Sequence, residues 1–228
     1  ATNSSSGNIN VGSYDLVYDR GLLSGLGYGF EDNASSTNEL TVNAKAITLS
    51  ASGVNKVYDG TTTSSATLNS SGVLSSDVIS FLGNASFANK DAGTAKTVNV
   101  NTFSKSGTDS ANYTISNTST TTTADITKKT ISVINSVASS KVYDGNTNAS
   151  LSNNGTLSGV ISGDSVGFTS TATFDNKNVG TSKVVSLDHT INGTNASNYI
   201  LSDGSTSGTI TPKAITARAN DLTKIYGN

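Results

Sequence analysis

The sequence predicts an all-β protein: tandem small antiparallel β-sandwich repeats, Ig-like in type, that form an extended rod. The first observation is composition, because the 228 residues include no Cys, Met or Trp, one Pro and 22 Gly, and are otherwise rich in Ser, Thr and Asn. These residues are poor helix formers, whereas Thr and Val suit a pleated, half-buried surface. The second is alternation of apolar and polar residues in short runs between turn signals. β-Grasp-like repeats are the alternative, with SSD or DSAN supplying a helical turn.

Eight short strands are expected in the first repeat, and each is bounded by residues that favour turns. The expected strands are 46–52, 55–58, 64–68, 77–82, 84–88, 96–103, 112–116 and 120–127. The turns between them are expected at Asp59-Gly60, Ser71-Gly72, Gly83-Asn84, Asp91-Ala92-Gly93 and Ser106-Gly107. In the run TVNVNTF, alternation places Val98, Val100 and Thr102 on one face.

The chain contains an internal repeat. Ile47, Ile131 and Ile215 lie in three similar connectors and are 84 residues apart in each case. KVYDGTT at 56–62 returns as KVYDGNT at 141–147, and KIYGN closes the sequence at 224–228. SDVISF (76–81) matches GDSVGF (163–168), ASFANKDAGTAKTV (85–98) matches ATFDNKNVGTSKVV (172–185), and SANYTI (110–115) matches SNYIL (197–201). Equal spacing with landmarks in the same order predicts two full repeats, 46–129 and 130–213, with partial units at 1–45 and 214–228.

The VYDG motif has a structural explanation. Val57 and Tyr58 would end a strand, and Asp59-Gly60 would form the next turn because glycine tolerates positive φ and aspartate accepts a backbone N–H two residues on. The tyrosine offers a large apolar ring whose hydroxyl can reach a backbone carbonyl. We therefore expect the motif to build the same corner in every copy.

These motifs resemble the YDG-type repeat of bacterial filamentous-haemagglutinin-like surface adhesins. SYDLVY near the start and LTKIYGN at the end resemble the companion MBG (YGX-type) repeat. The resemblance implies an extracellular stalk of a secreted bacterial adhesin, whose partners are neighbouring repeats or like chains in a fibre. It supplies no catalytic or ligand-binding residue, only a repeat signature. That signature is Lys56, Tyr58, Asp59, Gly60, Lys90, Gly93, Asn112 and Tyr113, then Lys141, Tyr143, Asp144, Gly145, Lys177, Gly180, Asn198 and Tyr199.

The residues offer little for catalysis or metal binding. His189 is the single histidine, is expected on a strand surface, and has no Cys or GxSxG motif to act with. The D-x-N-x-N sequence at Asp144 resembles the start of a calcium loop, but Ala149 stands where glycine is needed, so calcium is a minor alternative and no cofactor is predicted. A Lys–Asn isopeptide bond would pair Lys56 with Asn112, or Lys141 with Asn198. We therefore expect a protein that is not an enzyme.

Charge and aromatic content separate the remaining functions. A net charge of −2 and a pI near 5.2 do not indicate the basic surface that binds nucleic acid. No apolar stretch is long enough to span a membrane. The leading hypothesis is a rigid stalk. The alternatives are a module that itself binds glycan or protein, and lateral self-association into filaments. The best aromatic anchors for a binding surface are Tyr14, Tyr18, Tyr28 and Phe30.

Overall fold

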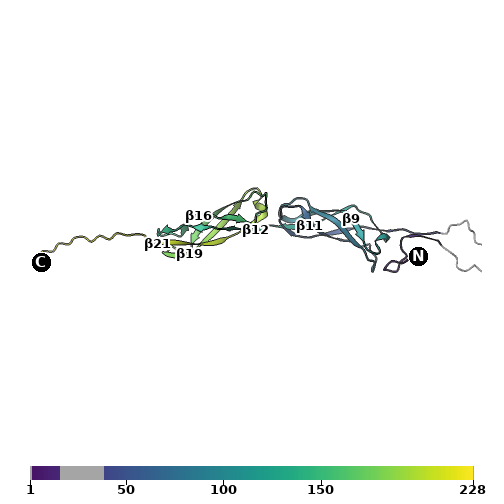
Figure 1. Cartoon of the computed structure of the whole chain (residues 1–228), viewed down its shortest axis with the longest axis horizontal. Helices are drawn as coiled ribbons and strands as arrows, with labels where there is room; N and C mark the ends of the chain where they lie inside the picture. Colours follow the sequence, from purple (N-terminus) through teal and green to yellow (C-terminus); the bar gives the residue numbers. More distant parts are fainter. Residues whose placement is uncertain (1, 16–38, 228) are drawn as a thin grey trace, which may run out of the picture. The chain divides into compact units, whose positions relative to one another are not determined.

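The computed structural model describes residues 2–15 and 39–227, and the chain forms two compact units. The first comprises Ala1–Lys56 and Thr61–Thr127, and the second comprises Val57–Gly60 and Lys128–Asn228. Strands and two short 3-10 turns are the regular elements described (Figure 1), so the all-β prediction is confirmed. In the described part of the chain, no helix is long and apolar enough to cross a membrane.

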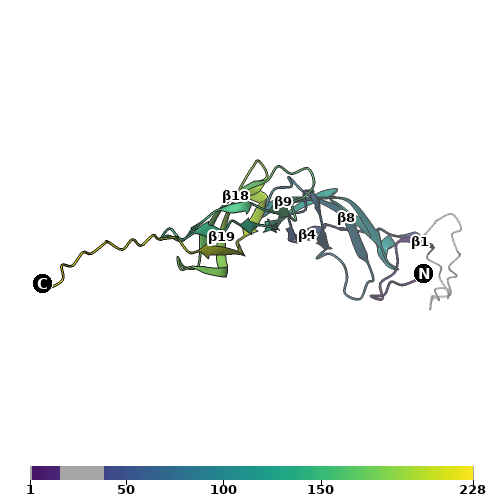
Figure 2. The same cartoon turned by 60° about the vertical axis from the view of Figure 1, so that its left-hand side comes forward.

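The first unit is built on a five-stranded sheet in the order β5-β11-β9-β8-β6, with three strand pairs beside it. Its central strands β8 and β9 can be followed in Figure 2. The pairs β1–β2 and β4–β7 are antiparallel, whereas β10 runs parallel to β3. The elements are β1 (Gly12–Asp15), β2 (Glu39–Val42), β3 (Lys45–Ile47), β4 (Ser50–Gly53), β5 (Lys56–Val57), β6 (Thr63–Ser64), β7 (Ala66–Asn69), β8 (Ser80–Phe87), β9 (Gly93–Ser106), η1 (Ser110–Asn112), β10 (Tyr113–Ile115) and β11 (Ser119–Thr127).

The second unit repeats this plan, with a five-stranded sheet in the order β14-β21-β19-β18-β15 and a smaller sheet, β17-β12-β20. Two of its strand pairs, β14–β21 and β12–β20, are parallel. The mixed pairing departs from the antiparallel sheets predicted; the Ig-like sandwich and the β-grasp alternative stay predictions. The elements are β12 (Lys129–Ile134), β13 (Val137–Ala138), β14 (Lys141–Val142), β15 (Asn148–Ala149), β16 (Leu151–Asn153), β17 (Thr156–Ser158), β18 (Gly167–Phe174), β19 (Gly180–Asn192), η2 (Ala196–Asn198), β20 (Tyr199–Ser202) and β21 (Gly204–Thr211).

Alternation along β9 and β19 produces the cores. Val98 and Val100 are 0% and 1% exposed, as the pattern predicts, and Val185 and Leu187 occupy the same face of β19. Thr102 does not join them, because its backbone turns to φ +55° and leaves the side chain exposed. That turn brings Phe103 into the apolar cluster of the first unit instead.

Several strands differ from the sequence prediction, and the one expected over 64–68 is two strands, β6 and β7, which pair with β8 and β4. The turn expected at Gly83-Asn84 is wrong, because β8 continues through it with a register shift against β9 between Leu82 and Asn84. A side chain at Gly83 would lie 3.1 Å from both Leu68 and Phe103, so packing explains this glycine. The single strand expected over 46–52 is instead two strands, β3 and β4, which pair with different partners.

Candidate functional site

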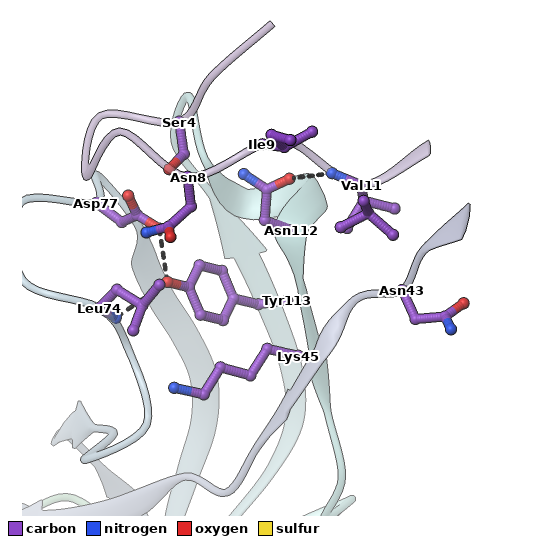
Figure 3. Close-up of a pocket in the computed structure, with 11 residues that line it drawn as sticks. Ser4, Asn8, Ile9, Val11, Asn43, Lys45, Leu74, Asp77, Asn112 and Tyr113 are labelled. Carbon is purple, nitrogen blue, oxygen red and sulfur yellow. Dashed lines mark hydrogen bonds between the residues drawn. The ribbon is translucent and has the colours of Figure 1, made fainter. Parts of the chain in front are cut away.

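An aspartate and a buried tyrosine meet in each unit, where a loop contacts the 3-10 turn. In the first unit, the Tyr113 hydroxyl donates to Asp77 Oδ2 at 2.6 Å and accepts from the Leu74 N–H at 3.0 Å (Figure 3). Tyr113 is 1% exposed and opens β10 directly after η1. We call Asp77 with Tyr113 the first Asp–Tyr site and the equivalent Asp164 with Tyr199 the second.

A second acidic residue joins the loop to the turn at the first site. Asp109 is 3% exposed and accepts the Val78 N–H at 2.8 Å. The close approach depends on Gly107, which has φ +114°, because a Cβ there would lie 2.3 Å from the Val78 carbonyl oxygen. The predicted turn at Ser106-Gly107 therefore positions the site as well as reversing the chain.

The N-terminal segment 2–11 contacts the open side of the first site (Figure 3). The Ser6 N–H donates to Asp77 Oδ1 at 2.8 Å, and the Ser5 N–H donates to Asp109 Oδ1 at 3.1 Å. Asn112 accepts the Val11 N–H at 2.9 Å. A cavity of about 410 Å³ remains between this segment, Tyr113 and the β2–β3 connection. The Asp77 carboxylate thus receives one donor from Tyr113 and one from the N-terminal segment of the same unit.

These hydrogen bonds perturb the ionisation of the site. Hydrogen bonding from Ser6, and then from the Tyr113 hydroxyl, lowers the pKa of Asp77 to about 2. The Val78 N–H is the main cause of the lowered pKa of Asp109. Burial raises the pKa of Tyr113, and its hydrogen bond to Asp77 raises it further. The site is therefore an anionic acceptor that holds neutral donors at neutral pH.

We expect the first unit to lose stability in acid through Asp77. Its folded pKa of about 2 lies below the ordinary value of 3.8, so its contribution is complete above about pH 4 and is lost as pH falls toward 2. Thermal unfolding of the chain between pH 5 and pH 2 measures this loss. Asp77→Asn should weaken the acid dependence of the first unit; an unchanged dependence would contradict the assignment.

The second site repeats the first with one substitution. The Tyr199 hydroxyl donates to Asp164 Oδ2 at 2.6 Å and accepts the Ile161 N–H at 3.0 Å. Asn195 stands where Asp109 stands in the first unit, and its Oδ1 accepts the Ser165 N–H at 2.9 Å. The same loop, 3-10 turn and tyrosine therefore build both sites, one from each repeat.

Tyr58 of the first VYDG motif completes the second site. Val57–Gly60 is part of the second unit, where the Tyr58 hydroxyl donates to Asp164 Oδ2 at 2.8 Å. Its ring meets that of Tyr199 edge-on, with centroids 5.4 Å apart and an interplanar angle of 76°. Tyr58 is 1% exposed. Two tyrosine hydroxyls thus share one carboxylate, and burial followed by the bond to Asp164 raises the pKa of Tyr199 to about 12.

The VYDG turn is therefore partly as predicted. Asp144 Oδ1 accepts the Asn146 N–H at 3.1 Å, which confirms the expected role of the aspartate in the second copy. Gly60 and Gly145 have φ +78° and +83°, as the turn requires. The expectation that the tyrosine hydroxyl reaches a backbone carbonyl is wrong, because Tyr58 donates to a carboxylate.

A lysine closes each VYDG turn. Lys141 Nζ lies 2.8 Å from Asp144 Oδ1, 2.8 Å from the Asn146 carbonyl oxygen and 2.9 Å from the Asn148 carbonyl oxygen. It also lies 5.7 Å from the centroid of the buried Phe174 ring. The oxygens considered for calcium therefore converge on an ammonium group. Across the described residues, no cluster of three or more His, Cys, Asp or Glu could hold a metal ion.

The first copy of the turn is closed in the same way. Lys56 Nζ donates to the Thr61 carbonyl oxygen at 2.8 Å and lies 5.6 Å from the centroid of the Phe87 ring. Asn112, named above with Lys56 for an isopeptide bond, is hydrogen-bonded to Asn10 and Val11 at the Asp–Tyr site, and the Lys–Asn bond stays a prediction.

Two lysines of each repeat lie in or beside the hairpin that the signature marks. Gly93 and Gly180 begin β9 and β19, while Lys177 is exposed and Lys90 is partly buried. A further lysine that the signature did not include is bonded here: Lys183 Nζ lies 2.9 Å from Asp175 and 2.7 Å from Asn176 Oδ1. Lys96 makes the equivalent bond to Asn89.

His189 is buried, so its expected place on a strand surface is wrong. It is 8% exposed rather than on the surface, because the buried face of β19 continues from Val185 and Leu187 to this position. Its Nδ1 lies 2.8 Å from Ser170 Oγ. Within the described chain, its Nε2 is buried without a hydrogen-bond partner.

The proposed aromatic anchors are placed only in part. The Tyr14 hydroxyl donates to the Asn10 carbonyl oxygen at 2.8 Å, so its polar end is used within the first unit. Tyr18, Tyr28 and Phe30 lie outside the described residues.

Comparison with known proteins identifies the repeat. A family model described as YDG domain matches residues 43–123 and 127–208. No curated protein and no solved structure matches the chain. Both Asp–Tyr sites lie within the matched segments, together with both VYDG turns.

Proposed function

We propose that this chain, which belongs to the YDG domain family, is a non-catalytic structural stalk segment of a large secreted bacterial adhesin or extracellular fibre. In this role it projects a distal adhesive region from the cell surface or builds biofilm matrix. Its partners are neighbouring repeats of the same long chain and like chains in the fibre. Resemblance of its flanking segments to MBG (YGX-type) repeats supports this context.

The observation that carries the proposal is the assignment of the first VYDG turn to the second unit. Residues 57–60 belong to the first YDG match in sequence and to the second unit in structure. Folding of one repeat therefore uses chain from its neighbour, which is the behaviour of a repeat array whose stability depends on adjacent units. An autonomous binding module on a flexible tether has no need of such sharing.

The connection between the repeats supports the same function. Strand β11 ends at Thr127 and β12 begins at Lys129, so a single residue separates them. No Gly/Ser-rich linker intervenes, and such linkers are what make domain arrays flexible. We therefore expect little freedom for one repeat to swing away from the next.

Small-angle X-ray scattering of the chain over a range of concentrations tests the proposal. A stalk predicts a rod-like profile with a length of two to three domains end to end, independent of concentration. A compact or freely flexing profile would contradict the stalk and favour a binding module. Growth in apparent mass with concentration would favour self-associating filaments instead.

A further inference from the structure

Tyr143 occupies the same position in the second VYDG motif as Tyr58 in the first, but its hydroxyl has no acceptor among the described residues. Tyr58 is 1% exposed, whereas Tyr143 is only partly buried. The backbone N–H of Tyr143 donates to the Thr211 carbonyl oxygen at 2.9 Å, which holds the turn on the sheet. The turn is therefore formed and the Tyr143 ring packs against the apolar cluster of the second unit, but its hydroxyl lacks the hydrogen bond that the Tyr58 hydroxyl makes.

The surroundings of Tyr143 are also incomplete. An open cavity of about 520 Å³ lies beside it and is lined by Asn178, Val179, Pro212, Lys213 and Ile215. Val179 is 48% exposed and Ile215 is 91% exposed. An exposed apolar surface around a tyrosine hydroxyl without a hydrogen-bond partner is typical of a site that a further segment of protein covers.

Both Asp–Tyr sites show what such a donor binds. At the second site the incoming donor is the Tyr58 hydroxyl, and at the first it is the Ser6 N–H. In each case the site's own tyrosine supplies one hydrogen bond and a segment outside the unit's sheets supplies another. The site is thus an acceptor for an incoming chain segment, and a VYDG tyrosine is one such donor.

We propose that the Tyr143-Asp144-Gly145 turn docks on the Asp–Tyr site of a further YDG repeat wherever one is placed directly after it, as the Tyr58 turn docks on the second site. The Tyr143 hydroxyl donates to the aspartate equivalent to Asp164, and its ring packs edge-on against the tyrosine equivalent to Tyr199. The VYDG motif then links one YDG repeat to the next, which gives the tyrosine in both copies a common role. This inference rests on the proposed stalk function, and it identifies the contact that would join successive YDG repeats of the stalk.

A three-repeat chain tests the docking directly. A second copy of residues 128–211 is inserted after Thr211, which recreates the Ile-Thr-Lys-Lys junction found at 126–129. The inserted copy carries Tyr143→Phe, so that the VYDG peptide of the original second repeat is distinguishable by mass. Nitration by tetranitromethane, read by peptide mass spectrometry, then compares Tyr143 in the parent and extended chains, with Tyr58 as an internal buried reference.

Docking predicts that nitration of Tyr143 slows by about tenfold or more in the extended chain, which corresponds to about 1.4 kcal/mol in favour of the docked state. Asp164→Ala in the inserted copy should restore much of the reactivity. The proposal is overturned if Tyr143 reacts equally fast in both chains while circular dichroism shows the inserted repeat folded. Scattering on the same proteins separates the two proposals, because a rod that lengthens with the third repeat upholds the stalk whether or not Tyr143 is protected.

Discussion

Replacing Tyr58 by alanine is expected to lower the free energy of unfolding of the second unit by about 3–5 kcal/mol, although Tyr58 belongs to the first repeat in sequence. The ring is 1% exposed and packs on Tyr199, and the hydroxyl shares the Asp164 carboxylate. Removing it leaves a cavity and deletes a charge-assisted hydrogen bond. Hydrogen exchange read by mass spectrometry follows peptides of residues 61–127 and 128–211 separately, and only the latter should lose protection.

Two variants show which part of Tyr58 matters. Tyr58→Phe keeps the ring and should cost about 1–2 kcal/mol, the usual range for a hydrogen bond to a charged group. Tyr143→Ala is the matched control, since it changes the same motif where the tyrosine is partly exposed, and should cost about 1 kcal/mol or less. Equal effects of Tyr58→Ala and Tyr143→Ala would contradict the difference that the structure shows between the two turns.

Tyr199→Ala is expected to be more damaging still, at about 4 kcal/mol or more for the second unit. The side chain is 2% exposed, and its hydroxyl bonds both Asp164 and the Ile161 N–H. Loss of the tyrosine therefore creates a cavity and strips the Ile161 N–H of its acceptor. Because a domain is stable by only about 5–15 kcal/mol, the second unit should open at mild denaturant concentration.

Calorimetry and hydrogen exchange on the full chain measure this effect. The first unit should retain its transition in Tyr199→Ala, and Tyr113→Ala should reverse the pattern because Tyr113 occupies the first Asp–Tyr site. A loss below about 1 kcal/mol in Tyr199→Ala would show that the buried tyrosine is not a structural centre of the unit.

Local patterns in the sequence predicted the all-β class, the two repeats and several of the turns. These features depend on residues near one another in the chain: alternation around Val98 and Val100, and glycine with positive φ at Gly60 and Gly107. Gly83 shows the limit of this reasoning, because the same residue type marks a turn or a tight packing contact, and only the neighbours Leu68 and Phe103 distinguish the two.

The Asp–Tyr sites were not predicted, although both aspartates stand in matching segments, SDVISF and GDSVGF. The available signal was that both repeats contain an aspartate in this segment and, 36 and 35 residues later, the tyrosine of an Asn-Tyr pair. The partner of the VYDG tyrosine cannot be predicted from a local pattern, because Tyr58 and Asp164 are 106 residues apart in the sequence. The position of His189 was predicted wrongly for a related reason. Thr102, the matching residue of the first repeat, turns out of the buried face of its strand, whereas His189 remains on that face in the second repeat.

The sharing of chain between repeats is tested most directly by a double-mutant cycle on Tyr58 and Asp164. Unfolding free energies of the second unit are measured for the parent chain, Tyr58→Phe, Asp164→Ala and the double variant. A hydrogen bond between the two side chains predicts a coupling energy of about 1 kcal/mol or more, because the second substitution costs less once the first has removed the bond. Additive effects within about 0.3 kcal/mol would show that the VYDG turn of one repeat is not part of the folded structure of the next.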